Sequence, residues 1–200
     1  MSDNYGFLAP FYQALSRAVL GRKILEANQA FLAENLTRKL IFIGGGDGMA
    51  YRPFAEFLEG SYYEKSSKML QLSQKNLANS QLNFIHGEFS GQEKGDCFIL
   101  PFMLDSLQDE EIQGLLVSIQ SSISPNGKLI FSDFFAPRTL RQKILHLGMI
   151  WFFRIFAAHS RVDLPNYPVF FQKAGFKLSE EKVWEGGWIK AQIYELDSRD

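Results

Sequence analysis

Glycines and carboxylates follow the short apolar segments of this sequence, where they could bind a nucleoside. Leu40–Ile43 lead directly into the glycine run Gly44–Gly48, and glycines there would permit positive φ angles and a close approach of the main chain to a ligand. Glu64 ends a second strand-like segment 20 residues after Gly44, and a carboxylate there could accept both hydroxyls of a ribose. Glu88 follows a third segment and could accept from an adenine amine.

Each of these features also has a structural interpretation. A glycine-rich turn is often only a tight turn, and a single carboxylate after a strand is usually solvated. Their order on successive strand ends favours ligand binding, because open α/β sheets bind ligands beyond the carboxyl ends of their strands. Pro101 and Phe102, just past a fourth segment, could flank an adenine plane. We therefore expect an adenosine-type cofactor.

These residues need a scaffold of alternating strands and helices, which the hydrophobic periodicity predicts. The predicted strands are Leu40–Ile43, a short strand ending at Tyr63-Glu64, Leu82–His86, Cys97–Leu100 and, after a turn at 124–127, Lys128–Ser132. The predicted helices between them are about Met49–Leu58, one capped by Ser66, and one that starts at Asp109. This alternation predicts an α/β protein with a mostly parallel sheet and helices on both faces.

The two ends of the chain read differently. Helical spacing predicts two helices within residues 1–36, separated at Gly21, and the second runs from Ile24 to Leu36. A long aromatic helix is predicted over about 139–158 and a shorter one ending at Gly175. Two strands, 177–184 and 188–196, are joined by so short a turn that they must pair antiparallel. We expect one domain with a helical cap (1–36), a cofactor-binding core (37–135), a helical lid (136–176) and a hairpin (177–200).

Composition narrows the function classes. The chain has 200 residues, is 46% hydrophobic and has a formal net charge of −1, which suits one domain and gives no electrostatic reason to expect nucleic acid. The lone Cys97 excludes an internal disulfide and a thiolate metal site, and we expect no metal. The N-terminal sequence lacks the basic and long apolar stretches of a signal peptide. We expect a cytoplasmic protein.

Several motifs resemble those of the class I S-adenosylmethionine-dependent methyltransferases. Gly44-x-Gly46-x-Gly48 after a strand is similar to the first motif of that family. The segment 64–70 resembles the family's acidic residue followed by a Ser-x-x-Met-Leu helix start, and Gly87-Glu88 matches the third motif. Segments 96–107 and 124–133 resemble the fourth and fifth motifs. The resemblance covers about 40–134 and implies a Rossmann-like, seven-stranded sheet with an antiparallel C-terminal hairpin.

The resemblance also implies the cofactor, S-adenosylmethionine, and S-adenosylhomocysteine as product. The glycines would pass close to its methionine and ribose portions, Glu64 would bind the ribose hydroxyls, and Glu88 would meet the adenine amine. The residues expected at the cofactor are Gly44, Gly45, Gly46, Asp47, Gly48, Glu64, Lys65, Ser66, Met69, Gly87, Glu88, Phe89, Leu100 and Pro101. Phe42 stands where the family often has an acidic residue, so another residue, such as Asp47, has to serve the amino end of the cofactor.

A sulfonium methyl group is already an activated electrophile, so the protein mainly aligns a nucleophile and excludes water. The candidates for orienting an acceptor or taking its proton are Asp133, His159 and Tyr12, and His146 is a further candidate base. Asp133 could instead cap the next turn, and a lone histidine is more often a packed or surface residue. The segment around Tyr12 resembles the opening of ubiquinone/menaquinone-type methyltransferases, where it covers the cofactor, but an amphipathic helix packed on the sheet is an equal interpretation.

The aromatic segment 144–158 bears on the acceptor. Its Trp and Phe residues surround the helix, which suggests either core packing or a lid that favours a small apolar or aromatic acceptor. It is too short, and with Arg154 too charged, to span a bilayer. Basic residues in 138–158 also allow a weak contact with a membrane surface. The Arg-Asn signature that the quinone methyltransferases carry after the fourth strand is missing here.

Three alternatives remain open at this stage. The GGGDG run also resembles polyamine (aminopropyl) synthases, which need an acid directly after the fourth strand, where this chain has Pro101 and Phe102. The chain could also be a non-catalytic cofactor-binding module, which Phe42 and the lack of an obvious base would suit. A nicotinamide oxidoreductase is disfavoured because the glycine spacing is G-x-G-x-G rather than G-x-G-x-x-G.

Overall fold

The computed structural model describes residues 21–156 and 163–197 of the chain. The predicted first helix and two candidate catalytic residues, Tyr12 and His159, lie outside these ranges. Within the described ranges, none of the helices is long and apolar enough to cross a membrane.

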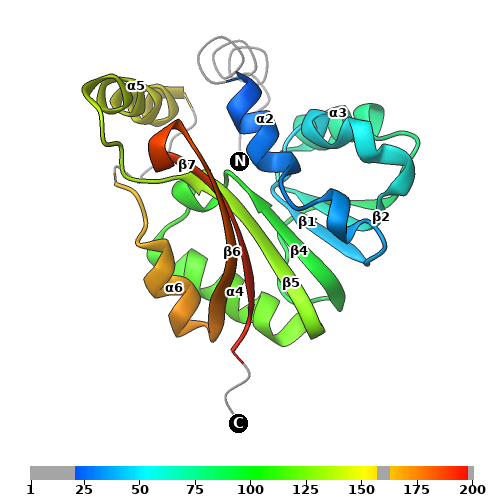
Figure 1. Ribbon diagram of the computed structural model, residues 1–200. Coiled ribbons are helices and arrows are strands. Elements are labelled where there is room, and N and C mark those ends of the chain that lie inside the picture. Colours follow the sequence, from blue (N-terminus) through cyan, green and yellow to red (C-terminus); the bar gives the residue numbers. More distant parts are fainter. Residues whose placement is uncertain (1–20, 157–162, 198–200) are drawn as a thin grey trace.

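One seven-stranded sheet organises the molecule, with the order β3-β2-β1-β4-β5-β7-β6 (Figure 1). The strands are β1 (Leu40–Ile43), β2 (Glu59–Glu64), β3 (Gln81–His86), β4 (Gly95–Pro101), β5 (Ile123–Phe134), β6 (Phe176–Trp184) and β7 (Ile189–Leu196). The first five strands pair in parallel, and β7 lies antiparallel between β5 and β6. The predicted fold class is confirmed. Strand order reverses between β1 and β4, so ligands are expected beyond the carboxyl ends of these strands.

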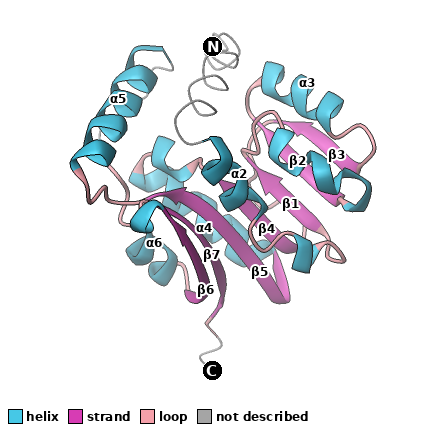
Figure 2. Ribbon diagram, turned by 45° about the horizontal axis from the view of Figure 1, so that its top comes forward, coloured by secondary structure: helices cyan, strands magenta, loops and turns pink. Residues whose placement is uncertain are grey.

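Helices cover both faces of the sheet (Figure 2). The helices are α2 (Gly21–Gln29), α3 (Ser67–Asn76), α4 (Asp109–Ser122), α5 (Leu140–Phe156) and α6 (Tyr167–Lys173), with 3-10 turns η1 (Ala33–Asn35), η2 (Met49–Phe57), η3 (Leu104–Ser106) and η4 (Glu185–Gly187). Successive side chains of a strand point to opposite faces. Ile41 and Ile43 therefore join the apolar cluster under α4 and α6, whereas Leu40 and Phe42 join the cluster under η2 and α3.

The structure corrects three local predictions. The helix predicted to run from Ile24 to Leu36 begins by Gly21 and ends at Gln29, because Phe31 takes a left-handed φ of 64°. The segment 49–57 is helical as predicted but forms 3-10 turns, with Pro53 inside, where a proline ring disfavours regular α-helix. The predicted turn at 124–127 is an irregularity within β5, whose pairing with β4 shifts between Gly95 and Cys97.

Helix α2 connects two parts of the sheet's carboxyl edge. The Asn28 side-chain oxygen accepts a hydrogen bond from the Ser132 hydroxyl of β5 at 3.1 Å. The neighbouring Gln29 side chain donates to the Ala50 carbonyl of η2 at 2.7 Å. Because Ala50 follows the glycine run and Ser132 lies near the end of β5, α2 spans the region where a ligand is expected.

Candidate cofactor and acceptor site

The glycine run after β1 forms a tight turn with an open side. Gly44, Gly46 and Gly48 all have left-handed φ angles, of 68°, 64° and 70°, which side chains other than glycine rarely adopt. A Cβ at Gly45 would overlap the Tyr62 hydroxyl, whereas a Cβ at Gly46 would meet no atom within 4 Å. The turn is therefore closely packed beneath Gly45 and leaves space beside Gly46.

Glu64, at the end of β2, faces this turn. Its side chain is 8% exposed; one carboxylate oxygen accepts from the Gly46 amide at 3.0 Å and the other from the Ser66 amide at 2.8 Å. The Tyr62 hydroxyl donates to the Gly46 carbonyl at 3.1 Å, which holds the turn from the same strand. Because each carboxylate oxygen has two acceptor sites, Glu64 can fix the turn and still accept from the hydroxyls of a ribose.

The start of α3 lies beside Glu64. Ser66 is the N-cap, and its hydroxyl accepts from the Met69 amide at 3.3 Å, as the sequence predicted. Lys65 forms an ion pair with Glu88, and the Glu88 hydrogen bond raises the pKa of Lys65. Both partners are about two-thirds exposed. Glu88 can reach an adenine amine from this position only if it shares or leaves its contact with Lys65.

Gly87, Phe89, Leu100 and Pro101 take different places around the site. Gly87 donates its amide to the Glu64 carbonyl at 3.1 Å, and a Cβ on Gly87 would meet no atom within 4 Å. The Phe89 ring packs against Tyr63 in the core, with ring centroids 5.3 Å apart. Leu100 and Pro101 are buried strand residues. Phe89 and Leu100 therefore face the core, so a contact with a cofactor would come from their main chain.

Phe42 occupies the position where an acidic residue is often found, and Asp47 is the residue expected to replace that acid at the amino end of the cofactor. Asp47 accepts from the Met49 amide through one carboxylate oxygen at 3.0 Å, and its carbonyl accepts from Asn76 at 2.8 Å. Phe42 is fully buried, with ring centroids 4.7 Å from Tyr51 and 5.5 Å from Tyr62. Phe42 is thus a core residue beneath the glycine turn, and Asp47 remains the acid beside that turn.

The loop after β4 brings a second group of residues to the turn. A Cβ at Gly44 would lie 3.2 Å from Cβ of Met103, so this loop packs directly on the glycine run. Phe102 donates its amide to the Ser132 carbonyl at 2.7 Å and takes a left-handed φ of 47°. The loop therefore connects the glycine turn with the end of β5.

Asp133, near the end of β5, is fully buried and lies against this loop. One of its carboxylate oxygens accepts from the Phe134 amide at 2.8 Å, and the other from the Asp105 amide at 3.4 Å. A hydrogen bond from Tyr167 also reaches its carboxyl group. Burial, and next the charge of Asp105, raise the pKa of Asp133 well above its usual range. Asp133 thus bonds main-chain amides, as a capping carboxylate would, but it is also buried with a raised pKa, and such carboxyls are frequent at functional sites.

Asp105, which lies in η3 and is partly buried, was missed by sequence reasoning. The sequence held a signal, because Asp105 follows β4 closely and β4 pairs with the strand that ends at Asp133. The pairing of these two strands, which the sequence does not state, is what brings the two carboxyl groups together.

A row of aromatic side chains leads from this carboxyl pair to α5. The ring centroids lie 5.1 Å apart between Phe102 and Phe134, 5.4 Å between Phe134 and Trp188, and 6.5 Å between Trp188 and His146. The Trp188 indole N–H is buried and has no hydrogen-bond partner among the described residues. Burial lowers the pKa of His146 and so favours its neutral form. In this row, henceforth the aromatic row, Phe134 and Trp188 are buried and Phe102 is partly exposed.

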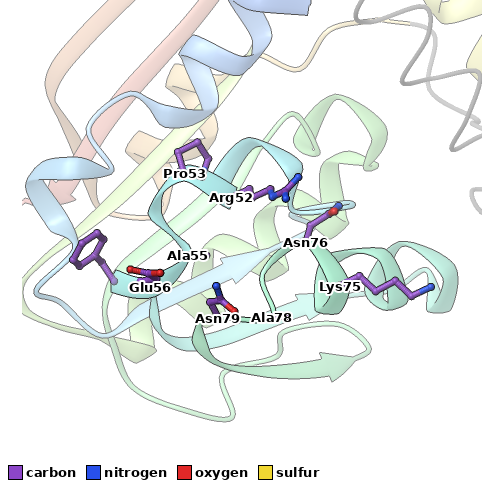
Figure 3. A pocket seen from close by; sticks show the side chains of 9 residues that line it. Arg52, Pro53, Ala55, Glu56, Lys75, Asn76, Ala78 and Asn79 are labelled. Atoms are coloured by element: carbon purple, nitrogen blue, oxygen red, sulfur yellow. The ribbon is translucent and has the colours of Figure 1, made fainter.

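A surface depression of about 430 Å³ lies elsewhere, between η2 and the end of α3 (Figure 3). Its lining residues are Arg52, Pro53, Ala55, Glu56, Phe57, Lys75, Asn76, Ala78 and Asn79. None of them is among the residues expected at the cofactor, so the depression is not assigned to it.

No protein-family model matches the chain. The chain is similar in sequence to O-methyltransferase 12 of Dictyostelium discoideum, with 29% identity over 105 residues, which are 52% of this chain and 28% of that protein. It is also similar to O-methyltransferase 4 of the same organism, with 26% identity over 176 residues, 81% of this chain and 48% of that protein. The chain thus spans half or less of the length of these curated relatives.

Solved structures share the fold at low sequence identity. The mitomycin 7-O-methyltransferase MmcR has a TM-score of 0.68 and 14% identity, over 88% of this chain and 54% of that one. A family 2 O-methyltransferase from Planctomyces limnophilus in complex with apigenin has a TM-score of 0.63 and 14% identity, over 80% and 50%. The DhpI–SAH complex has a TM-score of 0.68 and 14% identity, over 98% and 94%.

These similarities agree with the strand order and with the glycine turn that Glu64 faces. The chain has the class I S-adenosylmethionine-dependent methyltransferase fold, and its curated sequence relatives are O-methyltransferases.

Proposed function

We propose that the protein binds S-adenosylmethionine at the Gly44–Gly48 turn and transfers its methyl group to a hydroxyl of a small apolar or aromatic molecule. The observation that carries this proposal is the hydrogen bond between the buried Glu64 carboxylate and the Gly46 amide. It keeps an acceptor for sugar hydroxyls beside a main-chain turn that has open space. The relatives named above support methyl transfer over aminopropyl or hydride transfer.

The residues around the turn fit this cofactor. Glu64 would accept from the ribose hydroxyls, and the open side of Gly46 and Gly87 would admit the ligand next to the main chain. Glu88 would meet the adenine amine, and Asp47 would offer its carboxylate to the amino end. When bound, the cofactor supplies a sulfonium-activated methyl group. The protein has to hold the acceptor oxygen in line with that group and exclude water.

The carboxyl pair Asp105–Asp133 supports transfer to an oxygen atom. A hydroxyl acceptor must lose a proton as it attacks, so a base within reach accelerates the step. Two neighbouring carboxyl groups most readily hold one negative charge between them. Asp133 is fully buried and its pKa is raised, so the negative charge would lie on Asp105, the partly exposed member, which would receive the proton; Asp133 would act by positioning.

The aromatic row supports an apolar or aromatic acceptor. Phe102 is partly exposed, and its ring packs on the buried ring of Phe134, which in turn packs on the buried Trp188. A flat ligand would pack on the Phe102 ring, because offset and edge-to-face ring contacts add to the burial of apolar area. The acceptor that fits is therefore a small phenol or an apolar alcohol.

Two measurements test this function. Calorimetry of the purified chain with S-adenosylhomocysteine tests the cofactor, and we expect heat of binding from the wild type. Incubation with methyl-labelled S-adenosylmethionine and a panel of phenols, hydroquinones and apolar alcohols tests the transfer, with label expected in an ether product. Absence of cofactor binding would refute the whole proposal. Binding with no transfer to any panel member would instead favour a non-catalytic binding module.

A further inference from the structure

Helix α5 exposes an apolar stripe on the side away from the sheet. Leu140, Ile144 and Leu147 are 75%, 61% and 65% exposed, and their spacing places them on one side of the helix. The opposite side holds α5 to the body, where Leu145 packs on the cluster around Trp188 and Gln142 donates to the Glu185 carbonyl at 2.7 Å. Figures 1 and 2 both show α5 at the rim of the molecule.

Positive charges flank this stripe. At about 100° per residue, Arg141 lies to one side of Leu140 and Lys143 about 60° to the other side; both are exposed. The sequence has no Asp or Glu between Asp133 and Asp163, so no acidic residue within α5 offsets these cations.

Among the described residues, no other helix exposes three such side chains: Leu25, Phe57, Val117 and Val169 are single residues of α2, η2, α4 and α6, and Leu178, Val183 and Leu196 lie in β6 and β7. Phe57, Val117 and Val183 are 62%, 48% and 54% exposed, but they belong to η2, α4 and β6 in turn. Single exposed apolar residues on separate elements are normal for a soluble domain, whereas an apolar stripe bordered by charge on one helix indicates a contact surface.

We propose that this side of α5, termed the outer face and made of Leu140, Arg141, Lys143, Ile144 and Leu147, docks on an anionic lipid membrane. A helix with an apolar stripe between cations lies in the interface, with its apolar side chains among the acyl chains and its cations at the headgroups. A second copy of the chain is a poorer partner, because a two-fold contact of this face would bring the same cations together. The helix lies on the membrane and does not cross it.

Vesicle co-sedimentation of the full chain tests this proposal. The wild type is expected to bind vesicles that contain phosphatidylglycerol in phosphatidylcholine and to bind pure phosphatidylcholine much more weakly. The variant Arg141→Gln/Lys143→Gln should lower partitioning into anionic vesicles by about thirtyfold, because each cation near such a surface contributes about 1 kcal/mol. The variant Leu140→Ser/Ile144→Ser/Leu147→Ser should lower partitioning by about a hundredfold or more, since three apolar side chains lose their burial.

Matched controls remove the same groups elsewhere. Phe57→Ser/Val117→Ser/Val183→Ser deletes three exposed apolar side chains, and Lys173→Gln/Lys177→Gln deletes two exposed cations. Neither control should change partitioning by more than a few-fold, and all four variants should unfold near the wild-type temperature because these positions are exposed.

Three outcomes would overturn the proposal. The first is that the wild type does not bind anionic vesicles, and the second is that the outer-face variants reduce binding no more than their controls. The third is that the wild type dimerises in light scattering, loses the dimer in the triple serine variant and binds no vesicles, which would assign the face to a second copy. Because cofactor binding is measured separately, failure here leaves the proposed methyl transfer standing.

Discussion

The substitution Glu64→Gln tests the residue that connects the glycine turn with the start of α3. In the wild type, both carboxylate oxygens accept from main-chain amides, at 3.0 Å from Gly46 and at 2.8 Å from Ser66. A glutamine offers one oxygen and one NH2 group, so one of these amides would face another donor. A hydrogen bond to a charged group contributes about 1.5–3 kcal/mol, and a buried donor left without a partner costs about 1–3 kcal/mol.

Two effects follow from the same substitution. The apo protein should lose about 1–3 kcal/mol of stability, which lowers the unfolding temperature by roughly 2–12 °C for a chain of this size. The affinity for S-adenosylhomocysteine should fall by about ten- to hundredfold or more, because the ribose hydroxyls lose a charged acceptor. Calorimetry well below the unfolding temperature separates the second effect from the first.

Glu59→Gln is the matched control, since Glu59 lies at the exposed start of the same strand. It should change neither the unfolding temperature nor the affinity noticeably. The reasoning would be refuted if Glu64→Gln lowered stability but bound S-adenosylhomocysteine as tightly as the wild type. Glu64 would then be a structural support of the turn and no ligand of the cofactor.

Three further predictions use other parts of the site. Gly45→Ala should lower the free energy of unfolding by about 1–3 kcal/mol, because its Cβ would overlap the Tyr62 hydroxyl. Gly114→Ala in α4, whose Cβ meets no atom within 4 Å, should raise that free energy by up to about 1 kcal/mol. Urea unfolding that ranks the two variants the other way would contradict the packing of the turn. Because the pKa of Asp133 is raised, its contribution to stability is present at low pH and is lost as pH rises through the folded pKa. Asp133→Asn should therefore gain stability relative to the wild type as pH increases, and it should reduce kcat. A stability difference between the two proteins that does not change with pH would argue against the buried carboxyl. Glu88→Gln should leave the unfolding temperature nearly unchanged, because the ion pair of Glu88 with Lys65 is exposed. It should weaken S-adenosylhomocysteine binding about tenfold. Unchanged binding in calorimetry would show that Glu88 does not contact the adenine.

The sequence carried those parts of the site that depend on local signals. The glycine run, the acid at the end of β2 and the Ser66 cap are each set by residues within a few positions, and the structure has all three in place. The predicted end of α2 was wrong, because the left-handed φ of Phe31 ends the helix although the apolar spacing continues beyond it. Apolar spacing alone cannot show where a backbone angle changes sign.

The part of the site proposed for the acceptor could not be predicted from the sequence, because it forms from contacts between distant segments. Asp105 and Asp133 meet because β4 and β5 pair in a particular register, and Phe102 joins Trp188 only through the antiparallel insertion of β7. The segment 139–158 was predicted to be helical, which the structure confirms for Leu140–Phe156. The side of that helix that faces solvent could not be predicted, because aromatic residues occur all around it.

Phe42 occupies the position where related methyltransferases often have an acidic residue, and its surroundings explain why an acid would be unfavourable here. An Asp or Glu at this position would place a carboxylate between Tyr51 and Tyr62, both fully buried, and burial of an unpaired charge costs several kcal/mol. Phe42 avoids that cost, and its ring contacts with Tyr51 and Tyr62 stabilise the core next to the glycine turn. The Tyr51 hydroxyl then remains without a hydrogen-bond partner among the described residues, and burial, with the nearby charge of Asp47, raises its pKa. If the cofactor binds as proposed, the acid for its amino end must therefore come from a residue other than 42, and Asp47 lies in the glycine turn itself.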